Sequence, residues 1–207
     1  MSEIKKLEKK NKQNQLPVSV FFTDRKKISD LENTIKSLPK NSAIIIREYD
    51  LEQKDREIFA RKIKDLTKSR NIRIIVGKDL ILAIKIKADG LHFSDLDHLP
   101  LQFLERKKFK KKFIFSFACH SFKSVLKAQK LKADMIFISP IFPTKSHLNT
   151  QDLGIKNLAK ISFKTKSSSY VCPLLYALGG INSQNLLSVR KLGISGFAAI
   201  SLFLSNL

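Results

Sequence analysis

The sequence predicts a TIM (β/α)8 barrel in which the eighth helix is truncated or missing. Short apolar runs alternate with longer amphipathic segments along nearly the whole chain, giving eight expected strands and seven expected helices. Such alternation favours a parallel sheet, because each helical crossover carries the chain back to start the next strand in the same direction. Eight strands favour closure into a barrel, and an open doubly wound sheet is the alternative.

The expected elements follow one another with short connections. Strands are predicted at 18–24, 42–47, 73–76, 89–93, 112–118, 134–139, 173–178 and 196–201. Helices are predicted near 28–38, 54–69, 79–87, 99–108, 121–132, 154–161 and 182–192. The last helix has Asn182 and Ser183 as N-cap candidates and Gly193 as a candidate C′ residue.

The two ends of the chain set the predicted domain organisation. Residues 1–16 form a basic N-terminal extension, helical or disordered, and residues 17–207 form the barrel. Only six residues follow "AAIS", which leaves room for a single turn in place of the eighth helix. The extension or a second subunit could cover the first and last strands, so a homodimer is an open expectation.

The composition of the chain is that of a globular protein, with 43% hydrophobic residues in 207. Its longest apolar runs are far shorter than the roughly 20 residues of a membrane span, and no secretory signal is visible, so no membrane partner is expected. Cys119 and Cys172 have no CxxC spacing. They fit reduced thiols in a cytoplasmic protein better than a disulfide framework.

The net charge of +21 raises the question of a nucleic-acid partner. Two basic clusters stand out, "KKLEKKNK" and "ERKKFKKK", but lysine is spread through nearly every predicted helix. No RNA-binding motif accompanies these clusters. A solvated, lysine-rich surface is therefore the preferred interpretation, with no specific nucleic-acid partner, and RNA binding that survives physiological salt would reverse it.

In a barrel of this kind, function collects at the C-terminal ends of the strands. The polar residues that follow the predicted strands form a ring there: Thr23, Asp24, 47–50, 77–79, Asp95, Asp97, Ser116, His120, 144–147, Gly179, Gly180, Ile200 and Ser201. Glycines after the seventh strand allow a phosphate to approach the backbone closely. Gly179, Gly180, Ile200 and Ser201 therefore predict a phosphate site.

The loop "FISPIFPTKS" contributes to the same predicted site. Pro140 and Pro143 each fix their own φ and restrict the residue before them, which stiffens the exit from the strand. The loop would then hold Thr144, Lys145 and Ser146 as donors toward a phosphate. A merely rigid surface loop is the alternative.

Five segments resemble the thiamine phosphate synthase family and its relative, the thiazole tautomerase: "IIIREYD", "ADGLHFSDLD", "FISPIFPTKS", "ALGGINSQN" and "GISGFAAIS". The resemblance implies a barrel and the chemistry of thiamine biosynthesis. In the synthase, a pyrimidine diphosphate loses pyrophosphate with Mg²⁺ help, and the nitrogen of a thiazole phosphate captures the resulting cation. The implied partners are therefore a phosphorylated thiazole and a phosphorylated pyrimidine.

The resemblance also implies roles for single residues. Arg47 matches the family's diphosphate-binding arginine, and Asp97 matches one of its two magnesium aspartates. Thr144 and Ser146 match a Thr-x-Thr motif that holds the thiazole phosphate, and Gly180, Ile200 and Ser201 match further phosphate contacts. Lys145 is a candidate to reach the pyrophosphate in place of the family lysine, whose position is His147.

Other positions depart from the family pattern. Ile45 and Tyr49 replace a Gln and a Lys that flank the arginine, and Gly77-Lys78 replaces an Asn-Asp pair, so a magnesium ligand has become a cation. Asp79 is a candidate to supply the lost carboxylate after a one-residue shift. A lysine beside Asp97 would repel Mg²⁺ by Coulomb's law, although an ammonium can neutralise a diphosphate directly.

Two more departures bear on the chemistry. Ala118 stands at a family serine, with Ser116 on the same strand face. Pro140 stands where the tautomerase has its catalytic histidine, so proton transfer would fall to His120 or His147. The sequence thus favours a synthase-like enzyme with altered active-site chemistry, and the alternative is an inactive barrel of the same family that binds a phosphorylated ligand.

Overall fold

The computed structural model describes residues 16–94, 113–144, 152–167 and 173–203. In this part of the chain, eight parallel strands close into a barrel in sequence order, which confirms the predicted TIM barrel. The strands are β1 (Ser19–Phe22), β2 (Ala43–Ile46), β3 (Arg73–Gly77), β4 (Gly90–Phe93), β5 (Ile114–Cys119), β6 (Met135–Ile138), β7 (Leu174–Leu178) and β8 (Gly196–Ala199).

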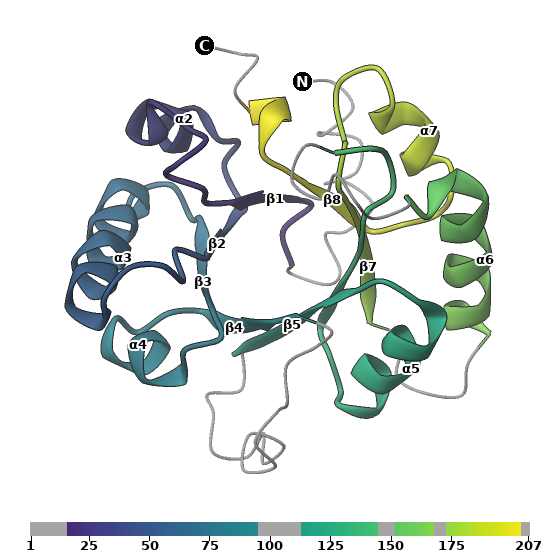
Figure 1. The fold of residues 1–207 in the computed structure, drawn as a ribbon, viewed down its shortest axis with the longest axis horizontal. Coiled ribbons are helices and arrows are strands. Elements are labelled where there is room, and N and C mark those ends of the chain that lie inside the picture. Colours follow the sequence, from purple (N-terminus) through teal and green to yellow (C-terminus); the bar gives the residue numbers. More distant parts are fainter. Residues whose placement is uncertain (1–15, 95–112, 145–151, 168–172, 204–207) are drawn as a thin grey trace.

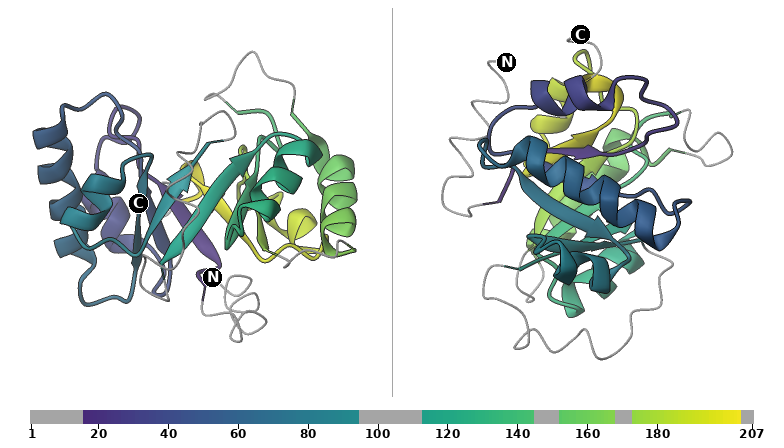
Figure 2. Two further views of the ribbon diagram at one scale, coloured as in Figure 1. Left: turned by 90° about the horizontal axis from the view of Figure 1, so that it is seen from below. Right: turned by 90° about the vertical axis from the view of Figure 1, so that its left-hand side faces the viewer.

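The helices lie outside the strands. They are α2 (Leu31–Ser37), α3 (Gln53–Thr67), α4 (Leu80–Lys85), α5 (Phe122–Lys130), α6 (Gly154–Lys166) and α7 (Leu186–Arg190), followed by the 3-10 turn η3 (Ser201–Phe203). Figure 1 shows α2 to α4 on one side of the barrel and α5 to α7 on the other, and the left view of Figure 2 shows the same division from below. The predicted helix at 99–108 and residues 1–15 of the predicted extension 1–16 lie outside the described residues.

The strands read as continuous apolar runs because both of their faces are buried. In β1, Val20 and Phe22 point into the barrel and pack with Ile45, while Phe21 belongs to the layer between the strands and the helices. The same alternation around the ring fills the inside of the barrel with side chains. A barrel of this kind has a packed interior rather than a pore.

Short polar side chains decide where several helices begin. Asp30 caps α2 by accepting the Asn33 N–H at 3.0 Å, so this helix begins at residue 31 rather than at the predicted 28. Ser121 caps α5 through a reciprocal capping box with Ser124. The predicted helix 182–192 is shorter, because its first residues form a separate turn.

That turn is built by Asn182. Its Oδ1 accepts the N–H groups of Gln184 and Asn185, each at 3.0 Å, so the residue stabilises a turn before α7 instead of capping the helix itself. Gly193 adopts the positive φ of 72° expected of a helix-terminating glycine.

The described chain ends in η3, in place of an eighth outer helix. Phe203 is buried there and contacts Phe21 of β1 edge-on, with ring centroids 5.9 Å apart, and Phe197 of β8 face-on at 6.2 Å. One aromatic side chain thus covers the outside of the first and last strands, where a full helix packs in a complete barrel. No helix in the described part of the chain is long and apolar enough to cross a membrane.

Tyr176 of β7 lies inside the barrel, reaches Pro17 just before β1, and makes the stability of the barrel depend on pH. The side chain is fully buried, and its hydroxyl donates to the Pro17 carbonyl at 2.5 Å. Burial raises the pKa of this phenol far above its ordinary value. The phenol ionises in the unfolded chain near pH 10 but stays neutral in the folded barrel. Its contribution to stability is therefore complete below pH 10 and falls above it by about 1.4 kcal/mol per pH unit.

The Tyr176→Phe variant tests this dependence. At neutral pH it is expected to lower the free energy of unfolding by about 1 kcal/mol, the usual net value of one hydrogen bond. Between pH 9 and 11 the difference from the wild type should shrink and then reverse, as measured by urea unfolding at each pH. Tyr49→Phe, which removes a half-exposed phenol, is the control. Parallel profiles of stability against pH for the wild type and Tyr176→Phe would show that Tyr176 does not cause this pH dependence.

Candidate functional site

The loops after β6 and β7 meet at one point of the barrel mouth. Ile141 N–H donates to the Leu178 carbonyl at 3.0 Å, and Phe142 N–H donates to the Gly179 carbonyl at 3.2 Å. The Pro-Ile-Phe-Pro loop therefore runs directly beside the two glycines that end β7. These two segments, predicted separately to contact a phosphate, are side by side in the structure.

The glycine pair has a conformation that other residues rarely adopt. Gly179 and Gly180 have φ values of 92° and 65°. A Cβ on Gly180 would lie 2.7 Å from both the Phe142 Cβ and the Pro143 carbonyl oxygen, and a Cβ on Gly179 would lie 2.8 Å from the Pro140 Cβ. Only glycine satisfies both the dihedral angle and the close approach of the neighbouring loop.

The remaining predicted phosphate contacts lie at the same end. Asn185 Nδ2 donates to the Gly180 carbonyl at 2.8 Å and fixes the peptide plane after β7. Leu178 of β7 pairs with Ala198 of β8, so Ile200 and Ser201 follow β8 next to the glycines. Thr144 is half-buried at the end of the described loop, whereas Lys145 and Ser146 lie outside the described residues.

Arg47 follows β2 and lies over the barrel mouth. Its guanidinium is 5.6 Å from the centroid of the Phe22 ring, which points into the barrel. Nε donates to the Thr23 carbonyl at 3.1 Å, and Nη2 pairs with the Asp24 carboxylate at 3.3 Å. The side chain remains 30% exposed, so a cation is held in place and is still accessible to a ligand at the mouth.

The acidic residues around Arg47 hold the loop that carries it. Glu48 is buried, accepts the Thr23 hydroxyl at 2.9 Å and accepts the Arg25 N–H at 2.9 Å. Asp50 is exposed, and a hydrogen bond from Lys26, helped by the charge of Arg25, lowers its pKa. Both carboxylates tie the loop after β1 to the loop after β2.

At the end of β3, Asp79 serves as a helix cap and ion-pair partner. Its Oδ1 accepts the Leu82 N–H at 2.8 Å, and its Oδ2 pairs with Arg56 at 3.3 Å. Arg56 is buried and also donates to the Gly77 carbonyl at 2.6 Å. Sequence reasoning missed this arginine, because its position on α3 does not show that it reaches the strand end.

The described residues at this strand end do not fit a magnesium site. Mg²⁺ needs oxygen ligands, but the Asp79 carboxylate is engaged by Arg56 and its neighbour Lys78 is an ammonium. No group of three or more His, Cys, Asp or Glu side chains in the described ranges is arranged to hold a metal. Asp97, the other predicted ligand, lies outside those ranges.

Removing the Asp79 side chain is expected to act on stability rather than on metal binding. Asp79→Ala should lower the free energy of unfolding by about 2–4 kcal/mol, because α4 loses its cap and the buried Arg56 loses its counter-charge. Asp79→Asn keeps a capping oxygen and should cost less. Urea unfolding in EDTA and in Mg²⁺ should give the same loss. Stabilisation of the wild type by Mg²⁺ that Asp79→Ala abolishes would contradict this role.

A polar pair inside the barrel lies below the mouth. His92 Nδ1 is 2.9 Å from the Ser116 hydroxyl, and both residues are buried on neighbouring strands that pair in register. The imidazole contacts the rings of Phe22 and Phe137 edge-on at 5.3 and 5.5 Å. Ser116 was predicted to lie in the ring of polar residues, whereas no role was predicted for His92, although the alternation of β4 already places His92 on the inner face with Gly90.

His120 directly follows β5, and a hydrogen bond to its ring selects one tautomer of the neutral imidazole. Its Nδ1 lies 2.7 Å from the Ser139 carbonyl oxygen. Because a carbonyl only accepts, Nδ1 carries the proton and Nε2 keeps its lone pair in the neutral ring. Ser139 precedes Pro140, joined to it by a cis peptide bond, so this imidazole lies next to the loop after β6.

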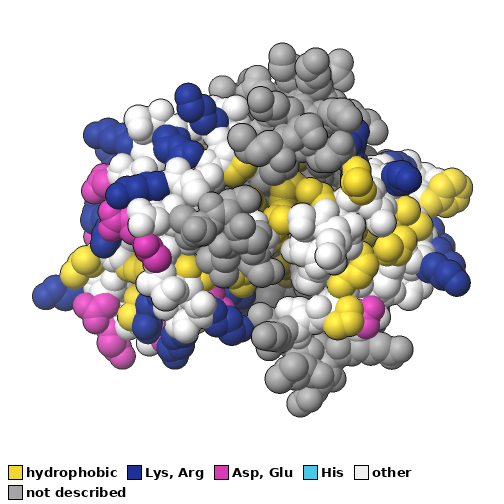
Figure 3. All heavy atoms as spheres, turned by 90° about the horizontal axis from the view of Figure 1, so that it is seen from above, with side chains coloured by type: hydrophobic (Ala, Val, Ile, Leu, Met, Phe, Trp, Pro, Cys, Tyr) yellow, Lys and Arg dark blue, Asp and Glu magenta, His cyan; other side chains and the backbone are white. Residues whose placement is uncertain are grey.

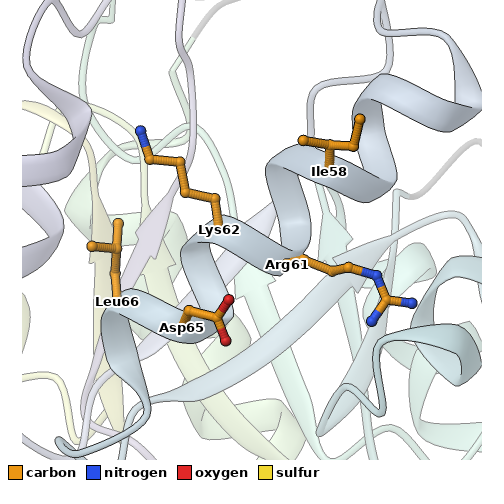
Figure 4. Close-up of a pocket in the computed structure, with 5 residues that line it drawn as sticks. All are labelled: Ile58, Arg61, Lys62, Asp65 and Leu66. Atoms are coloured by element: carbon orange, nitrogen blue, oxygen red, sulfur yellow. The ribbon is translucent and has the colours of Figure 1, made fainter.

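The outer surface is charged, and its two sides differ: the helices α5, α6 and α7 carry lysine and arginine side chains but no acidic residue. On the α2–α4 side, positive and negative side chains alternate, as Figure 3 shows, and several pair directly, such as Lys62 with Glu32 at 3.2 Å and Lys85 with Glu57 at 3.1 Å. A hollow of about 530 Å³ lies over α3 between Ile58 and Leu66 (Figure 4). It is lined by that helix alone and lies away from the barrel mouth.

A closed (β/α)8 barrel with glycines and an arginine gathered at its C-terminal mouth has the arrangement typical of barrel enzymes. The sequence model described as thiamine monophosphate synthase matches residues 19–203. This chain belongs to that family.

Relatives named for the same activity cover most of the chain. A protein of Aquifex aeolicus described as "Putative thiamine-phosphate synthase 2" is 35% identical over 195 residues, which cover 92% of this chain and 99% of that protein. Thiamine-phosphate synthase of Clostridium tetani is 30% identical over 183 residues, covering 88% and 82%. The solved thiamine phosphate pyrophosphorylase of Pyrococcus furiosus has the same fold, with a TM-score of 0.73, 24% identity and coverage of 92% and 88%.

Proposed function

We propose that this protein joins a pyrimidine diphosphate to a thiazole phosphate and releases pyrophosphate. The C–O bond between the pyrimidinylmethyl carbon and the diphosphate breaks, and its electron pair leaves with the pyrophosphate oxygen. The lone pair of the thiazole nitrogen then forms the new C–N bond, giving thiamine phosphate. Neither step needs an oxidant or a reductant.

This proposal rests on one observation: two regions on opposite sides of the barrel mouth could each bind an anion. On one side, the Pro-Ile-Phe-Pro loop packs against Gly179 and Gly180, where a phosphate can approach the backbone. On the other side, Arg47 holds a positive charge over the aromatic floor at Phe22. A diphosphate and a phosphate could thus be held at opposite sides while their carbon and nitrogen atoms meet between them.

Arg47 would stabilise the leaving group as its negative charge develops. Two hydrogen-bonded partners, Thr23 and Asp24, hold the guanidinium in place before the substrate arrives. Such a cation needs little reorganisation during bond breaking, which is the usual source of electrostatic catalysis. The buried aromatic rings of Phe22 and Phe137 would exclude water from the pyrimidinylmethyl cation, and water would otherwise compete with the thiazole nitrogen.

The test is a turnover assay with both substrates. Purified protein is incubated with thiazole phosphate and pyrimidine diphosphate, in Mg²⁺ and separately in EDTA, and thiamine phosphate is followed by chromatography. Formation above a protein-free blank, lost when either substrate is omitted, supports the proposal. Absence of the product in both conditions, with a folded protein, overturns it.

The second candidate is an inactive barrel that binds a phosphorylated thiazole. It is favoured by the loss of carboxylates available for catalysis: Asp24 pairs with Arg47, and Asp79 pairs with Arg56. Calorimetric titration with thiazole phosphate, combined with the turnover assay, separates the two, because this candidate predicts binding without any turnover.

The cellular setting is also a proposal. Cys119 is a buried cysteine at the end of β5, which is consistent with the proposed cytoplasmic location. A homodimer stays a prediction, and light scattering of the purified protein would measure its mass.

A further inference from the structure

The acidic residues of this chain are unevenly distributed, whereas its lysines are not. Eleven Asp or Glu residues fall within residues 16–94, but residues 113–207 contain only Asp134 and Asp152. Lysines continue through both parts of the chain, which is why a uniformly solvated surface was the preferred interpretation of the sequence. The structure places the second part in β5 to β8 and α5 to α7. One side of the barrel therefore carries cations with almost no acidic residues among them.

The helices α5 and α6 carry lysines on their outward surfaces. The lysines of α5 and the first three of α6 are spaced by three or four residues, so on each helix they lie along one face. Within the described part of the chain, none of the lysines of these two helices has an ion pair with a carboxylate, whereas Lys36 and Lys62 on the other side pair with Glu32. We call this surface the basic face, and its exposed lysines are Lys123, Lys127, Lys130, Lys156, Lys160, Lys164 and Lys166.

The basic face is continuous across the two helices. Lys164 Nζ of α6 lies 5.2 Å from the centroid of the Phe122 ring of α5, which is a cation–π contact between them. Lys166 Nζ donates to the carbonyl of Gly193, just after α7, at 2.9 Å. Figure 1 shows α5, α6 and α7 one after another along the outside of the barrel. The positive charge of the basic face is thus spread over neighbouring helices rather than confined to one.

An aromatic side chain lies among these lysines. Phe163 of α6 is 73% exposed, the largest fraction among the exposed large hydrophobic side chains of the described residues. It comes three residues after Lys160 and directly before Lys164, so a surface that contacts these lysines also reaches the ring. Figure 3 shows yellow apolar side chains beside dark blue ones on this side of the molecule. A basic helix that also exposes a phenylalanine is typical of proteins that bind the interface of an anionic membrane.

A lipid surface fits the basic face better than a nucleic acid does. The cations of α5 and α6 are all lysines, whereas recognition of nucleic-acid phosphates favours the planar guanidinium of arginine. A lysine ammonium is a hydrated point charge, which a charged surface attracts without a fixed geometry. The lysines also lie on the outward surfaces of helices, whereas proteins that follow a single strand hold it in a positively charged groove.

We propose that the basic face binds the surface of a membrane that contains anionic lipids, with its lysines at the headgroups and Phe163 inserted between them. Such a contact needs no spanning helix, and it departs from the expectation of no membrane partner. The inference does not depend on the proposed function. Because the basic face lies on the outside of the helices, the barrel mouth at Gly180 and Arg47 stays open to small substrates.

The experiment is co-sedimentation of the full chain with vesicles of phosphatidylcholine, with or without about one third phosphatidylglycerol, at physiological ionic strength. Binding is expected to the anionic vesicles and not to phosphatidylcholine alone. Lys156→Gln, Lys160→Gln and Lys164→Gln together should weaken it about 100-fold, since each lysine near an anionic surface strengthens binding about 5-fold. A folded protein that does not bind the anionic vesicles would overturn the proposal.

The matched control removes the same charge from the other side of the barrel. Lys36→Gln, Lys62→Gln and Lys85→Gln together replace three exposed lysines that pair with Glu32 or Glu57. This variant should weaken binding less than about 5-fold, because charges farther from the lipid surface than the Debye length of about 8 Å are largely screened. Equal losses in the two triple variants would show that only the net charge matters and would overturn the proposal.

Two further measurements test the ring and the kind of partner. Phe163→Gln should weaken binding to anionic vesicles about 10-fold without changing the charge, because less apolar surface is buried. Single-stranded RNA at an equal phosphate concentration should leave most of the protein on the vesicles, and displacement by RNA would assign the basic face to nucleic acid instead. Turnover by the triple variant at Lys156, Lys160 and Lys164 should equal that of the wild type, so this inference and the proposed function fail separately.

Discussion

Replacing Gly180 by alanine is expected to weaken binding of thiazole phosphate about 100-fold or more, as misplacement of a binding group by about 1 Å commonly does. The residue has a φ of 65°, which an alanine adopts only with strain. The new methyl group would also lie 2.7 Å from the Phe142 Cβ and the Pro143 carbonyl oxygen. The loop that leads to Thr144 would have to move, and with it the proposed phosphate site.

Calorimetric titration with thiazole phosphate measures this effect, and urea unfolding of the same variant shows whether the barrel is still folded. Gly193→Ala is the matched control, with a similar φ of 72° but only the flexible end of Lys166 near the new methyl group. It lies before β8, at the opposite end of the barrel. It should cost about 1–2 kcal/mol of stability, from the dihedral angle alone, and leave the affinity unchanged. Equal affinities for Gly180→Ala and the wild type would show that the phosphate binds elsewhere.

The barrel could be predicted from the sequence because its strands are buried on both faces. Each expected strand overlaps an observed one, since a short apolar run bounded by polar residues has few other ways to fold. The ends of the helices could be predicted less closely than the strands. Asn182 was expected to cap a helix, but it closes a turn, and this choice depends on the backbone two and three residues further on.

The roles of the acidic residues could not be read from the sequence. Asp79 follows β3 as a metal ligand would, and only its contact with Arg56, 23 residues earlier, shows that the carboxylate holds a helix and a buried cation. The Glu48 carboxylate likewise accepts hydrogen bonds from the loop after β1. Carboxylates that bind ligands and carboxylates that hold loops look alike in a sequence, because the difference lies in distant partners.

The two sides of the barrel mouth differ in how far the sequence predicts them. The side proposed to bind the thiazole phosphate depends on local features, namely glycines with positive φ and prolines, which a sequence shows directly. The side proposed to bind the diphosphate depends on packing between strand ends. The contact of Tyr49 with Gly77 and the register that brings His92 to Ser116 both join residues more than 20 positions apart. Such pairings require the register of neighbouring strands, which composition and periodicity do not give.

Arg47→Ala is expected to lower kcat/KM for the pyrimidine diphosphate about 100- to 1000-fold, the effect of removing one preorganised group that stabilises developing charge. The guanidinium lies over Phe22 and is held by Thr23 and Asp24, and Asp24 also pairs with Lys27 at 3.5 Å. Loss of the guanidinium therefore removes the cation over the Phe22 ring, while Asp24 keeps Lys27 as a counter-charge. Arg47→Lys keeps the charge but cannot keep both hydrogen bonds of the planar guanidinium, and an intermediate loss is expected.

Steady-state kinetics with each substrate varied in turn locate this effect. The loss should fall on kcat and on KM for the pyrimidine diphosphate, while KM for thiazole phosphate should stay within about 2-fold, because the proposed phosphate site lies across the mouth at Gly179 and Gly180. Arg25→Ala is the matched control, since it removes an exposed arginine that pairs with Asp50 on the same loops and leaves its backbone contact to Glu48 intact. If Arg25→Ala lost as much activity as Arg47→Ala, the activity would depend on the overall positive charge around the barrel mouth rather than on Arg47 itself. A specific loss at Arg47 assigns the departure of pyrophosphate to one fixed cation.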